Sequence, residues 1–185
     1  MKKHKIFNTG SRLGRPGRVK ELDFLSRKDK VILPKLNKQS RKDGSIFYGS
    51  FAVNKQLPRA FHRPHSDFDI FSRRQRIHAV EIEQCIDRST NSDMTHVKRL
   101  PHPTGKGNLF RVELRSDETA LVDLSPMKKT KTIVKDGVRY ETLPEAKKKY
   151  HRMLRTGDRF VKPTIDLNRI EEHESVKKFK RRRLF

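Results

Sequence analysis

The stretch from Gly49 to Phe71 reads GSFAVNKQLPRAFHRPHSDFDIF and carries the strongest structural pattern of the chain. Near its end, Asp67 and Asp69 alternate with the apolar Phe68 and Ile70, which is the pattern of a β-strand with one polar and one buried face. The two carboxylates are therefore expected side by side on one face of the strand. Because adjacent carboxylates repel unless a cation or solvent separates them, the pair indicates a metal site.

A third carboxylate lies in a hairpin predicted later in the chain. Apolar and charged residues alternate over 110–114, and a second apolar run over 120–124 follows a polar turn. Two such runs joined by a short turn are typical of antiparallel strands. Asp123 on the second run can meet Asp67 and Asp69 if the two strands are neighbours. From spacing alone, however, Asp123 is only an aspartate in a strand.

Together these segments resemble the nucleotidyltransferase superfamily, which includes DNA polymerase beta and the toxin-type enzymes of bacterial abortive-infection systems. That family has an apolar strand ending in Gly-Ser, an Asp-x-Asp pair on a second strand and a third carboxylate on a later strand. The corresponding segments here are Ile46-Phe47-Tyr48 before Gly49-Ser50, then Ser66-Asp67-Phe68-Asp69-Ile70, and finally Leu121-Val122-Asp123-Leu124. The connector between Ser50 and Asp67 is longer than is usual in the family.

The end of the domain extends this resemblance. Toxin-type members close with the pattern Arg-x-x-Lys-Asp-x-x-Asp-Leu-x-x-Ile, and here Pro163 replaces its first Asp. The matching residues are Arg159, Lys162, Asp166, Leu167 and Ile170. The resemblance implies an α/β (α+β) fold with a mixed sheet and flanking helices over about residues 44–172. Helices are indicated over 73–87, by the helical spacing of Ala79, Ile82, Cys85 and Ile86, and over 146–154.

The resemblance also implies roles for individual residues. A metal-dependent transfer of a nucleoside monophosphate from an NTP to a nucleic-acid or protein hydroxyl is expected, with Mg²⁺ or Mn²⁺ as the cofactor. Asp67 and Asp69 would bind two ions, and Asp123 only the ion that activates the attacking hydroxyl. The residues expected to bind the nucleotide are Gly49, Ser50, Arg63 and Lys162.

The charge of the chain indicates a polyanionic partner. Its 185 residues carry a formal net charge of +23 and are only 32% hydrophobic, which favours nucleic acid as the partner. The single Cys85 excludes an internal disulfide and a cysteine-rich zinc site. No apolar run suggests a membrane span or a signal peptide. We therefore expect a protein that is not secreted and that is cytoplasmic, nuclear or associated with a virion.

Basic segments are expected at both ends of the domain. Residues 1–44 carry fourteen Lys or Arg against four Asp or Glu, and this composition predicts an extended arm that orders on a partner. Residues 45–172 form the predicted domain, and residues 173–185 form a basic tail. The residues expected to bind nucleic acid are Arg12, Arg15, Arg18, Lys177, Lys178, Lys180, Arg181, Arg182 and Arg183.

Two functions fit this sequence. The three carboxylates favour an active nucleotidyltransferase. The charge and the basic arms favour a non-catalytic nucleic-acid-binding protein, or a structural component of a nucleoprotein or viral capsid assembly, built on the same fold.

Overall fold

One mixed sheet of eight strands organises the computed structural model, which describes residues 6–7, 17–102, 107–157 and 161–182. The strand order across the sheet is β1-β4-β5-β6-β3-β2-β8-β7, and helices flank it, which confirms the predicted α/β fold. The strands are β1 Ile6–Phe7, β2 Ile46–Tyr48, β3 Phe68–Ser72, β4 Thr95–Pro101, β5 Asn108–Leu114, β6 Ala120–Pro126, β7 Thr132–Lys135 and β8 Val138–Glu141. The helices are α1 Arg18–Asp43, α2 Gly49–Asn54, η1 Arg59–Phe61, α3 Gln75–Thr90, α4 Leu143–Thr156 and α5 Val161–Arg182.

The centre of the sheet contains the strands that the sequence assigns to the site. β3 runs antiparallel to β2 and parallel to β6. β5 pairs antiparallel with β6, so the predicted hairpin is confirmed. On the other side of β2, β8 adds in parallel and β7 pairs antiparallel with β8. Strands that are distant in sequence therefore lie side by side at β2, β3 and β6.

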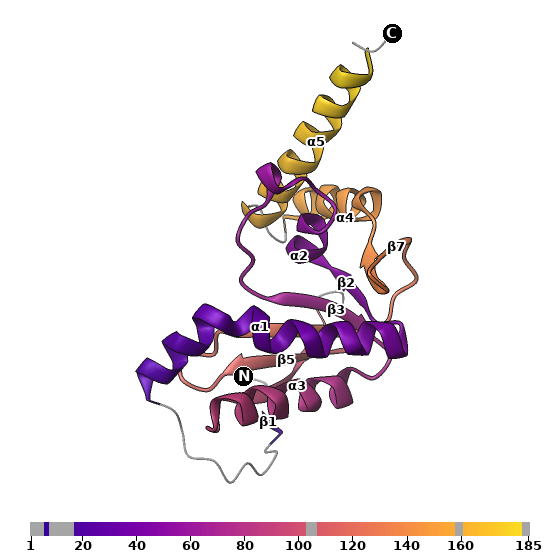
Figure 1. Cartoon of the computed structure of the whole chain (residues 1–185). Coiled ribbons are helices and arrows are strands. Elements are labelled where there is room, and N and C mark those ends of the chain that lie inside the picture. Colours follow the sequence, from indigo (N-terminus) through magenta and orange to yellow (C-terminus); the bar gives the residue numbers. More distant parts are fainter. Residues whose placement is uncertain (1–5, 8–16, 103–106, 158–160, 183–185) are drawn as a thin grey trace.

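The apolar face of the central strands packs against α3, and α1 lies beside α3 (Figure 1). The predicted helix after β3 is confirmed, with Ala79, Ile82 and Ile86 fully buried. These residues join Phe68 and Ile70 of β3 in one core cluster. Because successive side chains of a strand point to opposite faces, burying Phe68 and Ile70 turns the aspartates beside them to the other face.

The predicted extended arm over residues 1–44 is wrong for its described part, because Arg18–Asp43 forms the long helix α1. Phe24, Ile32 and Leu36 recur at helical spacing and are buried in the core cluster of the sheet. The charged residues between Phe24 and Leu36 are exposed or half-buried. A narrow apolar stripe suffices here because α3 supplies the opposing surface, and packing of that stripe stabilises a helix that composition alone does not favour.

A second, smaller core joins α2, α4 and α5. The predicted helix over 146–154 is confirmed as part of α4, which begins after Thr142. The buried residues of this second core are Val53, Leu57, Ala146, Tyr150, Leu167 and Ile170. This core fixes the first half of α5 beside α2, while the second half projects away from the rest of the molecule (Figure 1).

The predicted basic tail over residues 173–185 is helical where it is described, because α5 continues to Arg182. Residues 171–182 contain neither Gly nor Pro and are rich in Glu, Lys and Arg, which are good helix formers. Lys177 and Lys178 are exposed on α5, Lys180, Arg181 and Arg182 follow in the same helix, and Arg18 is exposed at the start of α1. Four of the residues singled out in the sequence lie outside the described ranges, namely Arg12, Arg15, Arg159 and Arg183. Of the helices described, none has the length and apolar character that crossing a membrane requires.

Candidate active site

Three carboxylates meet at the centre of the sheet. Asp67 immediately precedes β3, Asp69 lies within it, and Asp123 lies directly opposite Asp69 on the parallel strand β6. One carboxylate oxygen from each residue lies within 4.8 Å of the other two. The pairing of β3 with β6 thus brings Asp123 to the Asp67 and Asp69 pair, as expected if the strands were neighbours.

Asp69 lies in an environment that disfavours its charged form. Burial, followed by the charge of Asp67, raises the pKa of Asp69 to about 7. Gly49 presses against it, since a Cβ atom built on Gly49 would lie 2.1 Å from the Oδ2 atom of Asp69. The φ angle of Gly49 is 70°, a conformation that favours glycine. Gly49 is therefore required both for its backbone conformation and for the space that Asp69 occupies.

The three side chains fit a hard divalent cation. Carboxylate oxygens are the ligands that Mg²⁺ and Mn²⁺ prefer. The Asp69 carboxylate accepts no hydrogen bond from a described residue, and its ionised form is opposed by burial and by the charge of Asp67. A divalent cation shared by these oxygens would remove that penalty.

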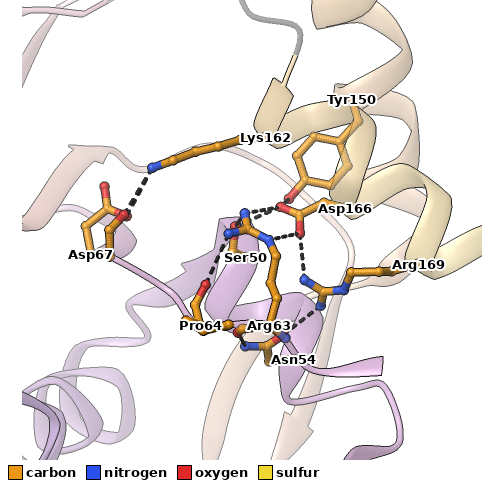
Figure 2. A network of polar contacts seen from close by, with 10 residues as sticks. Ser50, Asn54, Arg63, Pro64, Asp67, Tyr150, Lys162, Asp166 and Arg169 are labelled. Carbon is orange, nitrogen blue, oxygen red and sulfur yellow. Dashed lines mark hydrogen bonds and ion pairs between the residues drawn. The ribbon is translucent and has the colours of Figure 1, made fainter. Parts of the chain in front are cut away.

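A second polar group surrounds Asp166 of α5 (Figure 2). The Asp166 side chain is 2% exposed. The Arg63 guanidinium donates two hydrogen bonds to it, from Nε to Oδ1 at 2.7 Å and from Nη2 to Oδ2 at 3.0 Å. Ser50 donates its hydroxyl to Oδ2 at 2.7 Å. The Tyr150 hydroxyl and Arg169 Nη1 complete the set at 3.2 and 2.9 Å. One buried carboxylate therefore joins the α2 start, the connector, α4 and α5.

This arrangement keeps Asp166 ionised. Burial by itself raises the pKa of Asp166, but hydrogen bonds from Arg63 and Ser50 outweigh burial and hold the pKa below its usual value. Arg63 also donates to the Ser50 hydroxyl. Asn54 binds the Arg63 carbonyl at 2.8 Å and accepts from Arg169 at 2.6 Å. The structure thus brings the predicted Ser50 and Arg63 together, but it commits both side chains to Asp166.

Lys162 approaches the carboxylates from the first turn of α5 (Figure 2). Its Nζ atom lies 4.0 Å from Asp67 Oδ1 and donates to the Ser66 hydroxyl at 3.0 Å. Ser66 in turn donates to Asp67 Oδ1 at 2.7 Å. Because 55% of the Lys162 side chain is exposed, it remains free to reach an anion bound beside Asp67. Pro163 is buried beside it in the first helical turn, where proline is well tolerated.

Near the carboxylates lie three further side chains, which the sequence analysis did not predict as site residues. Arg111 of β5 binds both oxygens of Asp123, with Nε to Oδ1 at 2.7 Å and Nη2 to Oδ2 at 2.8 Å. Tyr48 lies opposite Asp69 in the sheet, and the Lys149 Nζ atom lies 4.6 Å from the centre of its ring. Alternation along β5 predicts which face of the strand Arg111 lies on, but its pairing with Asp123 depends on the register of two strands. No local sequence pattern indicates that Lys149 lies near the site.

No protein-family model matches the chain, and the comparison with curated proteins gives no match. Among solved structures, the Megavirus polyadenylate synthase matches 90% of this chain with a TM-score of 0.61 at 15% sequence identity. The chain has a nucleotidyltransferase-like fold. This nucleotidyltransferase-like chain spans 40% of the length of the Megavirus enzyme. JHP933 from Helicobacter pylori matches 79% of the chain and 66% of its own length, with a TM-score of 0.47 at 12% identity.

The fold confirms the resemblance that the sequence motifs indicated. In the nucleotidyltransferase-like sheet, the apolar strand β2 leads into Gly49 and Ser50, and β3 and β6 supply the carboxylates. At the identities observed, the likeness describes the architecture only. The roles of the site residues therefore rest on their geometry and on the proposal that follows.

Proposed function

We propose that this protein is a divalent-metal-dependent nucleotidyltransferase that moves a nucleoside monophosphate from an NTP to a nucleic-acid hydroxyl. The observation that supports it best is the cluster of Asp67, Asp69 and Asp123, whose oxygens lie within 4.8 Å of one another in a nucleotidyltransferase-like fold. The net charge of +23 supports a nucleic acid as the acceptor. Bound Mg²⁺ or Mn²⁺ would neutralise the triphosphate and lower the pKa of the attacking hydroxyl.

The residues around the cluster have separate roles in this proposal. Asp67 and Asp69 would hold the cations, and Asp123 would help to hold the one that activates the hydroxyl. The Ser50 hydroxyl is committed to Asp166, so its backbone N–H, in the first turn of α2, contacts a phosphate instead. Lys162 supplies the mobile positive charge for the triphosphate. Arg63 acts through Ser50, because its guanidinium is held by Asp166.

The transfer itself is a substitution at phosphorus. The acceptor oxygen forms a bond to the α-phosphorus, and the bond between that phosphorus and the β-phosphate oxygen breaks. Pyrophosphate leaves, and the proton of the acceptor hydroxyl passes to solvent. In this proposal Lys162 offsets the charge that builds on the departing pyrophosphate, and the 4.0 Å between its Nζ atom and Asp67 Oδ1 supports that role.

A non-catalytic nucleic-acid-binding protein remains the second candidate. The exposed Lys177 and Lys178 on the projecting α5, together with the high net charge, favour it. Such a protein would bind nucleic acid without needing nucleotide or metal. The predicted part in a nucleoprotein or capsid assembly stays a prediction, because none of the described features bears on it.

Incubation with each labelled NTP, Mg²⁺ or Mn²⁺, and single-stranded RNA or DNA tests the proposal. We expect labelled product from the wild type and none from Asp67→Asn. Asp93→Asn is the matched control, because Asp93 pairs with Arg115 outside the cluster. A wild type that binds nucleic acid but neither binds nor transfers any NTP would rule out the enzyme and leave the second candidate.

A further inference from the structure

Arg111 is the cation that most directly affects the third carboxylate. It lies opposite Asp123 in the register of β5 and β6, and its planar fork takes both carboxylate oxygens at 2.7 and 2.8 Å. The two side chains are 26% and 12% exposed. A two-pronged guanidinium–carboxylate pair of this kind is stronger and more directional than an ordinary hydrogen bond.

The register extends this pair into a row across the sheet. Lys98, Arg111, Asp123, Asp69 and Tyr48 lie directly opposite one another on β4, β5, β6, β3 and β2. Directly opposed residues share a face, so the positive side chains of β4 and β5 adjoin the negative ones of β6 and β3. Arg111 is thus the boundary between a cationic and an anionic half of the same surface.

A divalent cation at Asp123 competes with this guanidinium. Both seek the same carboxylate oxygens, and a fixed positive charge in contact with Asp123 repels a second positive charge there. Asp67 and Asp69 carry no such guanidinium fork from a described residue. The cluster is therefore unequal, with two carboxylates open to a cation and the third occupied by an internal one.

Once cations are held by Asp123 and Asp69, a displaced Arg111 has no carboxylate left to receive it on its row. Its other neighbour there is the cation Lys98. Glu113, two residues further along β5, already pairs with His96 and Lys98 at 3.0 Å each. The described residues of this row thus leave the guanidinium without a second anion, and a phosphate from outside the chain suits the planar fork of arginine.

This inference rests on the proposed function. We propose that Arg111 blocks the cation site of Asp123 until a phosphate of the acceptor strand draws the guanidinium away. The third carboxylate then becomes available only when the nucleic-acid acceptor is present. Such an order would suppress hydrolysis of the NTP by water when no acceptor is bound.

Binding of Mn²⁺ tests this without requiring turnover. Mn²⁺ is titrated, with a non-hydrolysable NTP analogue present, into the wild type, Arg111→Gln and Arg115→Gln. Arg115 is the matched control, because it pairs with Asp93 at 3.0 Å with a similar exposure of 19% and 20% but outside the cluster. We expect Arg111→Gln to bind its weaker Mn²⁺ at least about tenfold more tightly than the wild type does, because one adjacent positive charge is lost. Arg115→Gln should match the wild type.

The acceptor arm uses a single-stranded oligonucleotide without a 3′ hydroxyl, in RNA and in DNA form. Either form should tighten the weaker Mn²⁺ site of the wild type and leave that of Arg111→Gln nearly unchanged. An oligonucleotide that binds but leaves the wild-type site unaltered overturns the release of Arg111 by the acceptor. If the weaker Mn²⁺ site of Arg111→Gln has the same affinity as in the wild type, or a lower one, Arg111 does not block the cation site, and its role is to orient Asp123. Thermal unfolding checks that all three proteins are folded. If all three are folded and none binds Mn²⁺, the proposed function fails together with the inference.

Discussion

Gly49 controls the position of Asp69 at the level of single atoms. Its φ angle is 70°, and an added Cβ atom would lie only 2.1 Å from the Asp69 carboxylate, so any side chain must displace that carboxylate. We expect Gly49→Ala to weaken Mn²⁺ binding by at least about tenfold, because the oxygens move apart. Gly17→Ala is the control, since a Cβ atom at Gly17 would have no neighbour within 4 Å. Equal Mn²⁺ affinity in both variants would show that Asp69 tolerates the shift.

Asp69 also gives the metal-free protein an unusual pH dependence. The pKa of about 7 in the folded state exceeds the ordinary value of 3.8, so the folded protein keeps a proton that the unfolded chain releases. Stability should therefore fall as the pH rises between these two values. In EDTA at about pH 8, we expect Asp69→Asn to be more stable than the wild type by roughly 2 to 4 kcal/mol.

Urea denaturation across the pH range measures this difference. At about pH 3, Asp69→Asn and the wild type should converge, because Asp69 is then protonated in the folded state and, below its ordinary pKa of 3.8, largely protonated in the unfolded state too. Asp93→Asn serves as a control, since Asp93 lies outside the cluster. A difference that is constant with pH would assign the effect to packing and contradict the raised pKa.

At the level of secondary-structure elements, Asp166 connects α5 to the start of α2 and to the connector. Removing its charge leaves Arg63 and Arg169 partly buried without their partner. We expect Asp166→Asn to lower the free energy of unfolding by about 3 to 5 kcal/mol, as for other buried pairs that lose one partner. Glu145→Gln, which removes an ion pair with the 74% exposed Lys148, should change it by less than about 0.5 kcal/mol. Similar losses in the two variants would mean that the network contributes little.

Helix α1 belongs to the folded domain, so its buried stripe should contribute to stability. Leu36 is 1% exposed, and Leu36→Ala is expected to lower the free energy of unfolding by about 2 to 5 kcal/mol. Leu22 on the same helix is 61% exposed, and Leu22→Ala should have little effect. Chemical denaturation of both variants decides the matter. If Leu36→Ala is as stable as Leu22→Ala, then α1 is a detachable arm after all.

For the whole molecule, the net charge of +23 predicts nucleic-acid binding that weakens steeply with salt. Lys177 and Lys178 extend this charge along the projecting α5 (Figure 1). If both contact phosphates, changing them together to Gln should reduce the salt slope for single strands by about 1.4. The control changes Lys128 and Lys129, which are exposed between β6 and β7 and carry the same charge. Equal slopes in the two double variants would show that only the overall field matters.

Local pattern in the sequence determined much of this protein. Alternation at Phe68 and Ile70, and again through the β5 and β6 hairpin, reflects the geometry of a strand, which each segment carries by itself. Helical spacing in α3 does the same for Ala79, Ile82 and Ile86. These local rules were enough to place Asp67 and Asp69 on one face and, with the resemblance they support, to predict the mixed sheet.

How distant segments meet depends on the folded arrangement of the whole chain. Ser50 and Asp166 lie 116 residues apart in sequence, and Arg111 finds Asp123 only through the register of two strands. The helix α1 forms because α3 offers its apolar stripe a surface, whereas the composition of the segment alone favoured an extended chain. Such contacts depend on residues far along the chain, so a local sequence pattern does not predict them. The strand periodicity was therefore readable in advance, while the pairing of Arg111 with Asp123 and the network at Asp166 were not.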